Sequence, residues 1–572
     1  MEEPSPTSGA SVPLDETDSD QTPRFLRPII AVVLGLALIA AVGRWFDGFE
    51  ADDLQHLHAA WMVGQGKVPY RDYFDHHTPL YHVVFAPYAS AIGRDPLLLM
   101  ITFRMLAAVC ACGIFYLFWR LIARSNGPTY AWLGLGLLAA SRHSDLLFSL
   151  RPDYIAVLLL LIAITLMTES GKRVGFRYLS AGICIGLGFG FTQKVLALAP
   201  AFVVWAFVSV LRHPRGNRRD PFINLTAILA GMALPPILMV ATLARVGALP
   251  GFLAGPIGFA SHWIQPKSWV QFTQEPVLLE FALFALGFAW ALRSVVSWIT
   301  FRDTADADAL LGLLVLFGTV GLLLTPAPTQ QAYMITMSLW LHACGIRFVL
   351  FLLEHRAMNG TNPAFRYQLF VGFAVALLLL TYYNMLVAAT AWAGLFSLWK
   401  RRQDSMERRG FSAVWAIGML ALLPAIASIA TSSDRILRNS ARPQIEAMRA
   451  IDHHVSENGA VLTTWPIYTP FRPHATFHWF SDEGMYTSMP LDVLRREYIA
   501  ALDDLNTDVA VVDRDAWERY LPVLVNELDL RFQEVVVPRE GLAGARAYAR
   551  RQGHPSGGSS SGEGTIQLSP KR

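Results

Sequence analysis

Long apolar runs constrain the fold of this chain more than any other feature. About thirteen runs approach the roughly 20 apolar residues that a helix needs to cross a bilayer. They lie near residues 27–46, 97–119, 128–147, 152–169, 177–197, 199–211, 221–247, 277–300, 308–325, 332–354, 366–383, 385–400 and 411–431. Only 16% of the 572 residues are charged, whereas a soluble protein carries about a quarter. The sequence therefore predicts a mainly α-helical, multi-pass membrane protein.

Lys and Arg are concentrated in alternate loops between these runs, as is typical of cytoplasmic loops. "ESGKRVGFR", "RHPRGNRRD" and "KRRQDSMERR" are basic, whereas residues 47–96 and 249–276 are poorer in basic side chains for their length. With an odd number of spans, the N-terminus is expected in the cytoplasm and the C-terminal region outside. Residues 1–24 are rich in Pro, Ser, Thr and acidic residues. They predict a disordered cytoplasmic tail before an uncleaved anchor.

The C-terminal region has a different pattern. "AVLTTW", "DVAVVD" and "FQEVVV" are short β-branched runs, and "PLDVLRREYIAALDDL" and "AWERYLPVLVNEL" have helical periodicity. We therefore expect a transmembrane domain over residues 25–431 and a small extracytoplasmic α/β domain over 432–552. Residues 553–572 are Gly/Ser-rich and predict a flexible tail. The net charge of +3 gives no reason to expect nucleic acid as a partner.

Residues 50–82 place many titratable groups directly after the first apolar run. Leu54, Leu57 and Trp61 share one helical face, which predicts a short amphipathic helix in the membrane interface. Asp52 and Asp53 lie at its start, where a helix stabilises carboxylates. Capping accounts for at least one of them, but ionisable groups held at a membrane are also functional candidates. A second helix is expected from "PLYHVVF" onward.

Together with two later stretches, this loop resembles the GT-C superfamily of membrane glycosyltransferases, in the branch of protein O-mannosyltransferases and lipid A aminoarabinose transferases. That family's first outer loop carries an Asp-Glu pair, an amphipathic helix and the element Gly-x-x-Pro-Tyr-x-Asp-x-x-x-His-Lys-Pro-Pro-Leu-Tyr. The matching residues are Asp52, Asp53, Gly66, Pro69, Tyr70, Asp72, Asp75, His76, Pro79, Leu80 and Tyr81. "SLRPDYIAVLLLL" resembles the start of the family's fourth span, and "GLGFGFTQKVLALAP" resembles the following outer turn.

The resemblance covers about residues 27–210, and the later spans match only in architecture. Two departures stand out. The acidic pair is Asp52 and Asp53 rather than Asp-Glu, and His77, Thr78 and Pro79 replace Lys-Pro-Pro. A histidine is largely neutral near pH 7 where the family's lysine is charged.

The resemblance implies transfer of a sugar, usually with inversion, from a polyprenyl-phosphate donor to an extracytoplasmic lipid, glycan or protein. An attacking hydroxyl needs a carboxylate base, and a leaving phosphate needs positive charge. Asp52 is expected to be the base, by its match to the family's first acidic position. Asp53 is the alternative base, or it orients the acceptor or a metal. Arg151, Lys194 and His77 are the candidates for binding the donor phosphate. For Arg151 and Lys194 the alternative is snorkelling of the charge to the interface.

Weaker candidates for binding the acceptor or a metal are His56, Asp75, His76 and Asp153. Mg²⁺ or Mn²⁺ is the candidate cofactor because both accept hard oxygen ligands. The alternative for the histidines is hydrogen bonding to backbone or lipid headgroups, and Asp153 is either a partner of Arg151 or a helix-start residue. Arg104, inside a span, is expected to pair with a carboxylate such as Asp95 or to line the cavity.

"TWPIYTPFRPHATFHWFSDEGMY", with Arg472, His474, His478, Asp482 and Glu483, suits either acceptor binding or a loop packed on the membrane face. Two other classes of function stay open: a transporter or flippase for a polar lipid, and an inactive GT-C-like lipid-binding scaffold. A transporter predicts charges in mid-span and inverted repeats, whereas the polar groups here cluster in the first outer loop. The outer α/β domain resembles that of bacterial members of the group, and this resemblance implies the bacterial plasma membrane as the location. The sequence leaves open the sugar, the acceptor, the length of the prenyl carrier and the oligomeric state.

Overall fold

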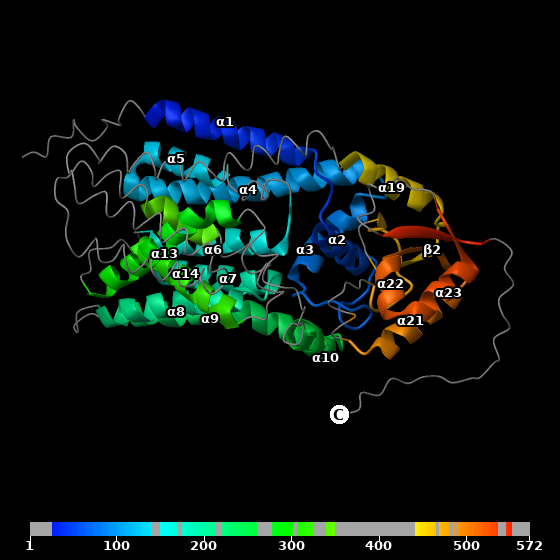
Figure 1. The fold of residues 1–572 in the computed structure, drawn as a ribbon. Coiled ribbons are helices and arrows are strands. Elements are labelled where there is room, and N and C mark those ends of the chain that lie inside the picture. Colours follow the sequence, from blue (N-terminus) through cyan, green and yellow to red (C-terminus); the bar gives the residue numbers. More distant parts are fainter. Residues whose placement is uncertain are drawn as a thin grey trace, which may run out of the picture.

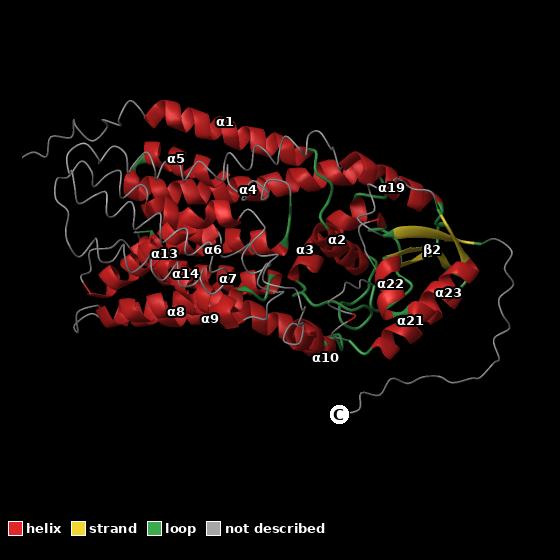
Figure 2. Cartoon of the chain, viewed as in Figure 1, coloured by secondary structure: helices red, strands yellow, loops and turns green. Residues whose placement is uncertain are grey.

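The computed structural model of the chain describes residues 26–139, 149–169, 174–212, 219–259, 277–300, 306–324, 339–348, 441–464, 468–479, 486, 489–535 and 545–551. Within these residues, long apolar helices run along one part of the molecule, and a small sheet with its helices forms the opposite end (Figure 1). All the named strands lie at that end (Figure 2).

The long helices begin and end close to the expected bounds. They are α1 (Leu26–Trp45), α4 (Pro96–Asn126), α5 (Pro128–Ala139), α6 (Pro152–Thr168), α7 (Val174–Phe191), α8 (Val195–Arg212), α9 (Arg219–Arg245), α13 (Val277–Thr300) and α14 (Asp306–Leu324). Residues 339–348 are also helical. Proline and glycine fix several of these ends. Pro96 starts α4 after Asp95, whose side chain accepts a hydrogen bond from Leu97 N at 3.0 Å. Gly127 ends α4 at φ 83°, a conformation that favours glycine.

By length and composition, three described helices can cross a membrane: Pro96–Arg124, Val174–Phe191 and Pro221–Arg245. Shorter apolar helices cover Ile30–Trp45, Pro152–Thr168, Val195–Leu211 and Ala307–Gly321. The chain is therefore a helical membrane protein. The expected total of about thirteen spans stays a prediction, because residues 349–440 lie outside the described part.

Helices α7 and α9 approach each other through glycine. A Cβ atom on Gly182 would lie 2.3 Å from Ile228 O, and one on Gly231 would lie 2.3 Å from Leu179 O. Small residues permit such backbone contact between membrane helices, where apolar burial adds little because lipid is equally apolar.

The bundle also contains a buried ion pair. Asp308 of α14 accepts two hydrogen bonds from Arg347 in the 339–348 helix, at 2.7 and 2.5 Å. Both side chains are below 10% exposed, so each charge depends on the other for its partner in an apolar surrounding.

Arg104 of α4 holds the end of α1. Its guanidinium donates to the carbonyl oxygens of Trp45 and Asp47 and lies 5.7 Å from the centroid of the Trp45 ring. The expected pairing with Asp95 is wrong, because Asp95 caps α4 and forms an ion pair with Arg449 at 3.3 Å. The last carbonyl groups of a helix have no hydrogen-bond partner within that helix. Arg104 donates to one of them, Trp45 O.

The C-terminal segment forms a four-stranded sheet of order β1-β2-β4-β3. The strands are β1 (Ala460–Thr463), β2 (Thr507–Val512), β3 (Phe532–Glu534) and β4 (Arg546–Arg550), and the helices are α19 (Ala441–His453), α21 (Leu491–Asp503), α22 (Arg514–Tyr520) and α23 (Pro522–Arg531). β1 and β2 are parallel, and β4 is antiparallel to both β2 and β3. The strand and helix predictions for this segment are confirmed, except that "AWERYLPVLVNEL" is divided by Pro522 into α22 and α23. Whether it is a separate extracytoplasmic domain stays a prediction.

Both faces of this sheet are covered. Val509 and Val511 of β2 pack with α19 and with side chains of α4 and of α2 (Ala51–Gly64), whereas Ala510 and Val512 pack with α21, α22 and α23. Alternate residues of a strand point to opposite faces, so the unbroken apolar run in β2 reflects burial on both sides.

Helices α2 (Ala51–Gly64) and α3 (Leu80–Ala91) lie between the bundle and the sheet (Figure 1). Gln55, His56 and His58 of α2 are below 10% exposed, so these residues of the expected amphipathic helix do not face solvent. Its position in the membrane interface stays a prediction. The polar face of α2 is covered by protein: Pro470 O, for example, lies 2.7 Å from His58 Nδ1.

Candidate functional site

The first turn of α2 carries the two candidate catalytic carboxylates. Asp52 forms an ion pair with Arg151, and Glu50 lies 3.4 Å from the same guanidinium. Glu50 is the residue before α2, and its side chain makes no capping hydrogen bond. The carboxylate of Asp52 is 45% exposed, whereas Arg151 is 11% exposed. The side chain of Asp52 is therefore accessible to solvent, whereas that of its cationic partner is mostly covered by protein.

Asp53 has a different environment. It is 3% exposed, and Ser149 Oγ donates a hydrogen bond of 2.7 Å to Asp53 Oδ1. Ser149 and Arg151 belong to the short segment that leads into α6. One segment therefore supplies the partners of both carboxylates.

These environments move the two pKa values apart. The charge of Arg151 holds the pKa of Asp52 below its usual range. Burial, helped by the nearby charge of Glu50, raises the pKa of Asp53 to about 8. At neutral pH, Asp52 is ionised and Asp53 mainly protonated, a division that enzymes use to give paired carboxyl groups different roles.

Lys194 adds a second cation to the site. It follows α7 in the turn before α8, and its Nζ lies 2.7 Å from Asp153 Oδ2. Its charge also lowers the pKa of Asp52, so it belongs to the same group of charges as Arg151. Asp153 lies in the first turn of α6 and forms its ion pair with Lys194, and the positive charge of Arg151 nearby also acts on Asp153. Lys194 and Arg151 are 15% and 11% exposed; both bind carboxylates within the protein rather than reaching for the interface.

The loop between α2 and α3 brings the predicted histidines together. His77 Nδ1 lies 3.1 Å from Asp75 Oδ1, and the rings of His76 and His56 lie 3.8 and 4.3 Å from that of His77. Burial lowers the pKa of His77 to about 4. A neutral His77 can donate one hydrogen bond to a phosphate, but it supplies no positive charge there.

Sequence reasoning missed Glu50 and Ser149. Glu50 stands two residues before Asp52, and its position about one helical turn from Asp53 was a usable signal. Ser149 has no motif in "SRHSDLLFSLRPD", and only the fold places it against Asp53.

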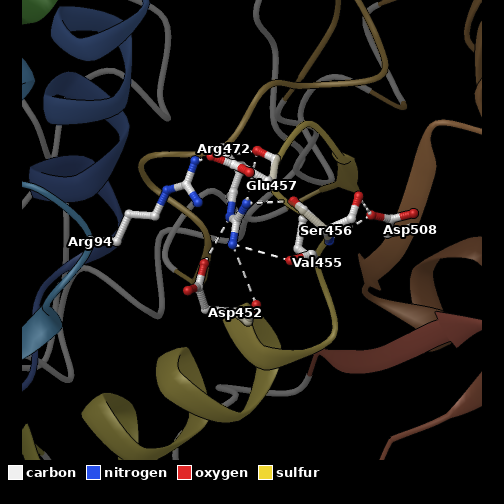
Figure 3. Close-up of polar contacts among 7 residues, drawn as sticks. All are labelled: Arg94, Asp452, Val455, Ser456, Glu457, Arg472 and Asp508. Carbon is white, nitrogen blue, oxygen red and sulfur yellow. Dashed lines mark hydrogen bonds and ion pairs between the residues drawn. The ribbon is translucent and has the colours of Figure 1, made fainter.

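In the C-terminal segment, the side chain of Arg472 contacts the end of α19 and the residues that follow it (Figure 3). It is 4% exposed, forms an ion pair of 2.8 Å with Asp452, and donates to the carbonyl oxygens of Ser456 and Val455 at 2.7 and 3.2 Å. These groups close the end of α19, where a cation is favoured by the helix dipole. Arg472 therefore joins parts of the C-terminal segment to one another; whether this loop packs on the membrane face stays a prediction.

His474 and His478 also contact other protein groups. The His474 ring packs edge-on against His58 at 4.1 Å, and His478 Nδ1 lies 2.7 Å from Glu497 Oε2. Asp482 and Glu483 lie outside the described residues.

The comparisons define the fold. No protein-family model and no curated protein matches the sequence. The structure of ArnT from Cupriavidus metallidurans bound to undecaprenyl phosphate matches with a TM-score of 0.52 and 14% identity, over 92% of this chain and 98% of that chain. The same protein in the apo state matches with a TM-score of 0.52 and 13% identity, over 91% and 98%. ArnT is a lipid A aminoarabinose transferase of the GT-C superfamily.

The chain is thus a membrane protein with the GT-C fold, and the resemblance inferred from its first outer loop is confirmed at the level of fold. An oligosaccharyltransferase from Archaeoglobus fulgidus also matches, with 13% identity over 92% of this chain and 74% of that chain. The TM-score of this match is 0.45.

Proposed function

We propose that the chain is an inverting glycosyltransferase that moves a sugar from a polyprenyl-phosphate donor to an extracytoplasmic lipid, glycan or protein acceptor. The observation that carries the proposal is the ion pair between half-exposed Asp52 and Arg151, whose side chain is only 11% exposed. It joins a carboxylate that can accept a proton to a cation that can bind phosphate. The undecaprenyl phosphate bound to ArnT supports a carrier of this class.

In the proposed reaction, the acceptor oxygen attacks the anomeric carbon as the bond from that carbon to the phosphate oxygen breaks. The electron pair of the broken bond leaves with the polyprenyl phosphate, and the acceptor proton passes to Asp52. Arg151 and Lys194 stabilise the growing negative charge on the phosphate. Asp53 is the second carboxyl group of the site; in its protonated form it holds the start of α2 against Ser149.

The same ion pair suggests how Asp52 becomes a better base when the donor binds. Without donor, Arg151 lowers the pKa of Asp52 and so weakens it as a proton acceptor. A bound phosphate competes for the guanidinium. Because Asp52 then loses part of its ion pair, its pKa rises toward the usual value.

Other parts of the proposal follow from the sequence. We place the protein in the plasma membrane of a cell with an envelope glycan or lipid acceptor, with its N-terminus in the cytoplasm and the sheet outside. Mg²⁺ or Mn²⁺ at the donor phosphate would add positive charge to that of Arg151 and Lys194.

The test is release of free polyprenyl phosphate by membranes that contain the wild-type chain, supplied with a panel of polyprenyl-phosphate sugars and an acceptor extract. We expect release by wild type, loss with Asp52→Asn, and full release with Asp492→Asn. Asp492 is an exposed carboxylate that pairs with Arg496 within α21, and it is the matched control.

If the Asp52→Asn variant still released polyprenyl phosphate, the transferase reaction would be supported but Asp52 would be rejected as its base. No release with any donor, from folded wild-type protein, would reject the transferase and favour transport of a polar lipid or a binding scaffold.

A further inference from the structure

We propose that a groove beside α21 binds a saccharide segment of the acceptor, one that carries hydroxyl or ammonium groups and no acid group. The inference rests on the proposed function, because it names the class of acceptor that such a transferase would take. The groove has a volume of about 620 Å³, which is typical of sites for small ligands.

Two parts of the C-terminal segment form the groove. One wall is the chain from Ala475 to His478, and the other is one face of α21 and the residue after it, with Val493, Glu497, Ala500, Ala501 and Asp504. These five positions recur every one helical turn, so they lie on the same side of the helix. The two alanines have side chains of a single carbon, which leaves the groove hollow along the middle of this face.

Carboxylates are the main polar groups of the groove. Glu497 Oε1 accepts a hydrogen bond from His478 N, and Glu497 Oε2 lies 2.7 Å from His478 Nδ1. Each of these oxygens can accept a second hydrogen bond. Asp504 Oδ1 accepts from Asn506 N and Nδ2 at 3.0 and 3.1 Å, whereas Oδ2 of this exposed residue has no hydrogen-bond partner among the described residues. The groove therefore suits a ligand that is rich in donors.

Charge limits the ligand further. No Lys or Arg is among the described residues that line the groove, and Arg550 meets Asp504 at its backbone carbonyl oxygen. A phosphate or carboxylate group would lie beside like charge, whereas a hydroxyl or ammonium group would donate to Glu497 and Asp504. Charge complementarity therefore excludes acidic sugars and favours neutral and amino sugars.

The wall that faces α21 carries an exposed aromatic ring. Phe477 lines the groove and is 37% exposed. The apolar C–H face of a sugar would remove this ring from water, and an ammonium group is attracted to the face of such a ring. An aromatic ring on one wall and carboxylates on the other match the two surfaces of a sugar, its C–H face and its hydroxyl edge.

The groove is joined to the candidate catalytic site. Phe74 N donates to Phe477 O at 3.0 Å, and Trp479 Nε1 donates to Phe74 O at 2.8 Å. Phe74 lies in the loop that follows α2, the helix with the candidate carboxylates. The apolar helices that suit a prenyl tail lie away from the sheet (Figure 1). A saccharide in the groove therefore belongs to the acceptor rather than to the lipid part of the donor.

The experiment measures binding to the full-length protein in nanodiscs by saturation-transfer NMR titration, without donor. The probes are the trisaccharides of glucosamine, N-acetylglucosamine and galacturonic acid, together with trilysine, at a mildly acidic pH that keeps the glucosamine amines protonated. We expect the glucosamine trisaccharide to bind most tightly and the galacturonic acid trisaccharide about tenfold more weakly or less. Equal or tighter binding of the acidic trisaccharide, binding of trilysine alone, or no binding of any probe would overturn the proposal.

Two variants locate the binding in the groove. Ala500→Trp places a large ring on the groove floor and should abolish binding of the glucosamine trisaccharide. Phe477→Ala removes the aromatic ring but keeps the carbonyl oxygen that accepts from Phe74, and it should weaken binding about 3–10-fold. Arg496→Trp is the matched control on α21, because the side chain of Arg496 is 75% exposed and lies outside the groove lining; it should bind as wild type does. Unchanged binding in both groove variants would reject the site.

These measurements separate the groove from the transferase. Saccharide binding in the groove without release of polyprenyl phosphate would support the site and reject the transferase. Release of polyprenyl phosphate by a protein that binds no saccharide probe would support the transferase and reject the groove.

Discussion

Asp52 and Asp53 are neighbours in the sequence, yet their surroundings give them opposite protonation states. Both were predicted as candidates because carboxylates at the membrane face of an outer loop are costly without a role. Which of the two would be ionised and which protonated was not predictable from the sequence. It depends on Ser149 and Arg151, which are about a hundred residues away in the sequence and meet α2 only in the fold.

Asp53→Asn should stabilise the protein in a pH-dependent way. The folded protein keeps the Asp53 proton up to a pKa of about 8, whereas an unfolded aspartate loses it near 3.8. Between these values the folded state binds more protons, so the stability of the wild type falls as pH rises. The asparagine removes this loss, and its Oδ1 can still accept from Ser149. Melting temperatures in detergent should show a gain over wild type that is larger near pH 8.5 than near pH 5; an equal gain at both would contradict the prediction.

Arg151→Gln tests the link between phosphate binding and the base, and it rests on the proposed function. Without the guanidinium, the pKa of Asp52 should rise, so the acidic limb of the pH profile of kcat/KM should move to higher pH. The rate itself should fall about 10²–10³-fold, because a charge that stabilises the leaving group is lost. Arg151→Lys should retain part of the rate. A fall in rate with an unmoved acidic limb would separate Arg151 from Asp52.

At the scale of elements, helix ends were well predicted because proline, glycine and charge mark them locally. The burial of α2 was not predicted. Its sequence has the alternation of a surface helix, and nothing within "DDLQHLHAAW" reveals that residues 470–479 cover its polar face. The pairing of α7 with α9 was also missed, because the glycines that permit it are informative only once the two helices are known to be neighbours.

Gly231→Leu should separate α7 from α9. Its Cβ atom would lie 2.3 Å from Leu179 O, a backbone atom that cannot turn away. Overpacking of this kind costs about 1–3 kcal/mol or more, so the folded yield and melting temperature in detergent should drop. Gly35→Leu on α1 is the matched control, since a Cβ atom there meets nothing within 4 Å. Equal effects of the two substitutions would show that helix propensity, not the close approach, is responsible.

At the scale of the whole molecule, the sheet is part of the support of the candidate site. Phe49 N donates to Gln444 Oε1 at 2.6 Å, and Gln444 Nε2 donates to Phe49 O at 3.2 Å. This reciprocal pair fixes the backbone directly before Glu50 and α2. The apolar side chains of α2, α4, α19 and β2 form one continuous cluster on the same side.

Gln444→Ala should therefore reduce the proposed transferase activity although Gln444 touches no candidate site residue. Both Phe49 backbone groups would lose their partner in a buried place, at a cost of about 1–3 kcal/mol. Arg442→Ala, on the same helix but 78% exposed at its side chain, should leave activity and melting temperature unchanged. Unaltered activity in Gln444→Ala would mean that the sheet is not needed to position α2.

The contacts between Phe49 and Gln444 and between His58 and Pro470 also set an order in time. Their partners are separated by 395 and 412 residues, so the helix that carries the candidate carboxylates leaves the ribosome long before its cover is made. Until then, the buried histidines and apolar face of α2 have no partner from the sheet. The candidate active site can thus be completed only after translation has passed Pro470, about 400 residues beyond α2.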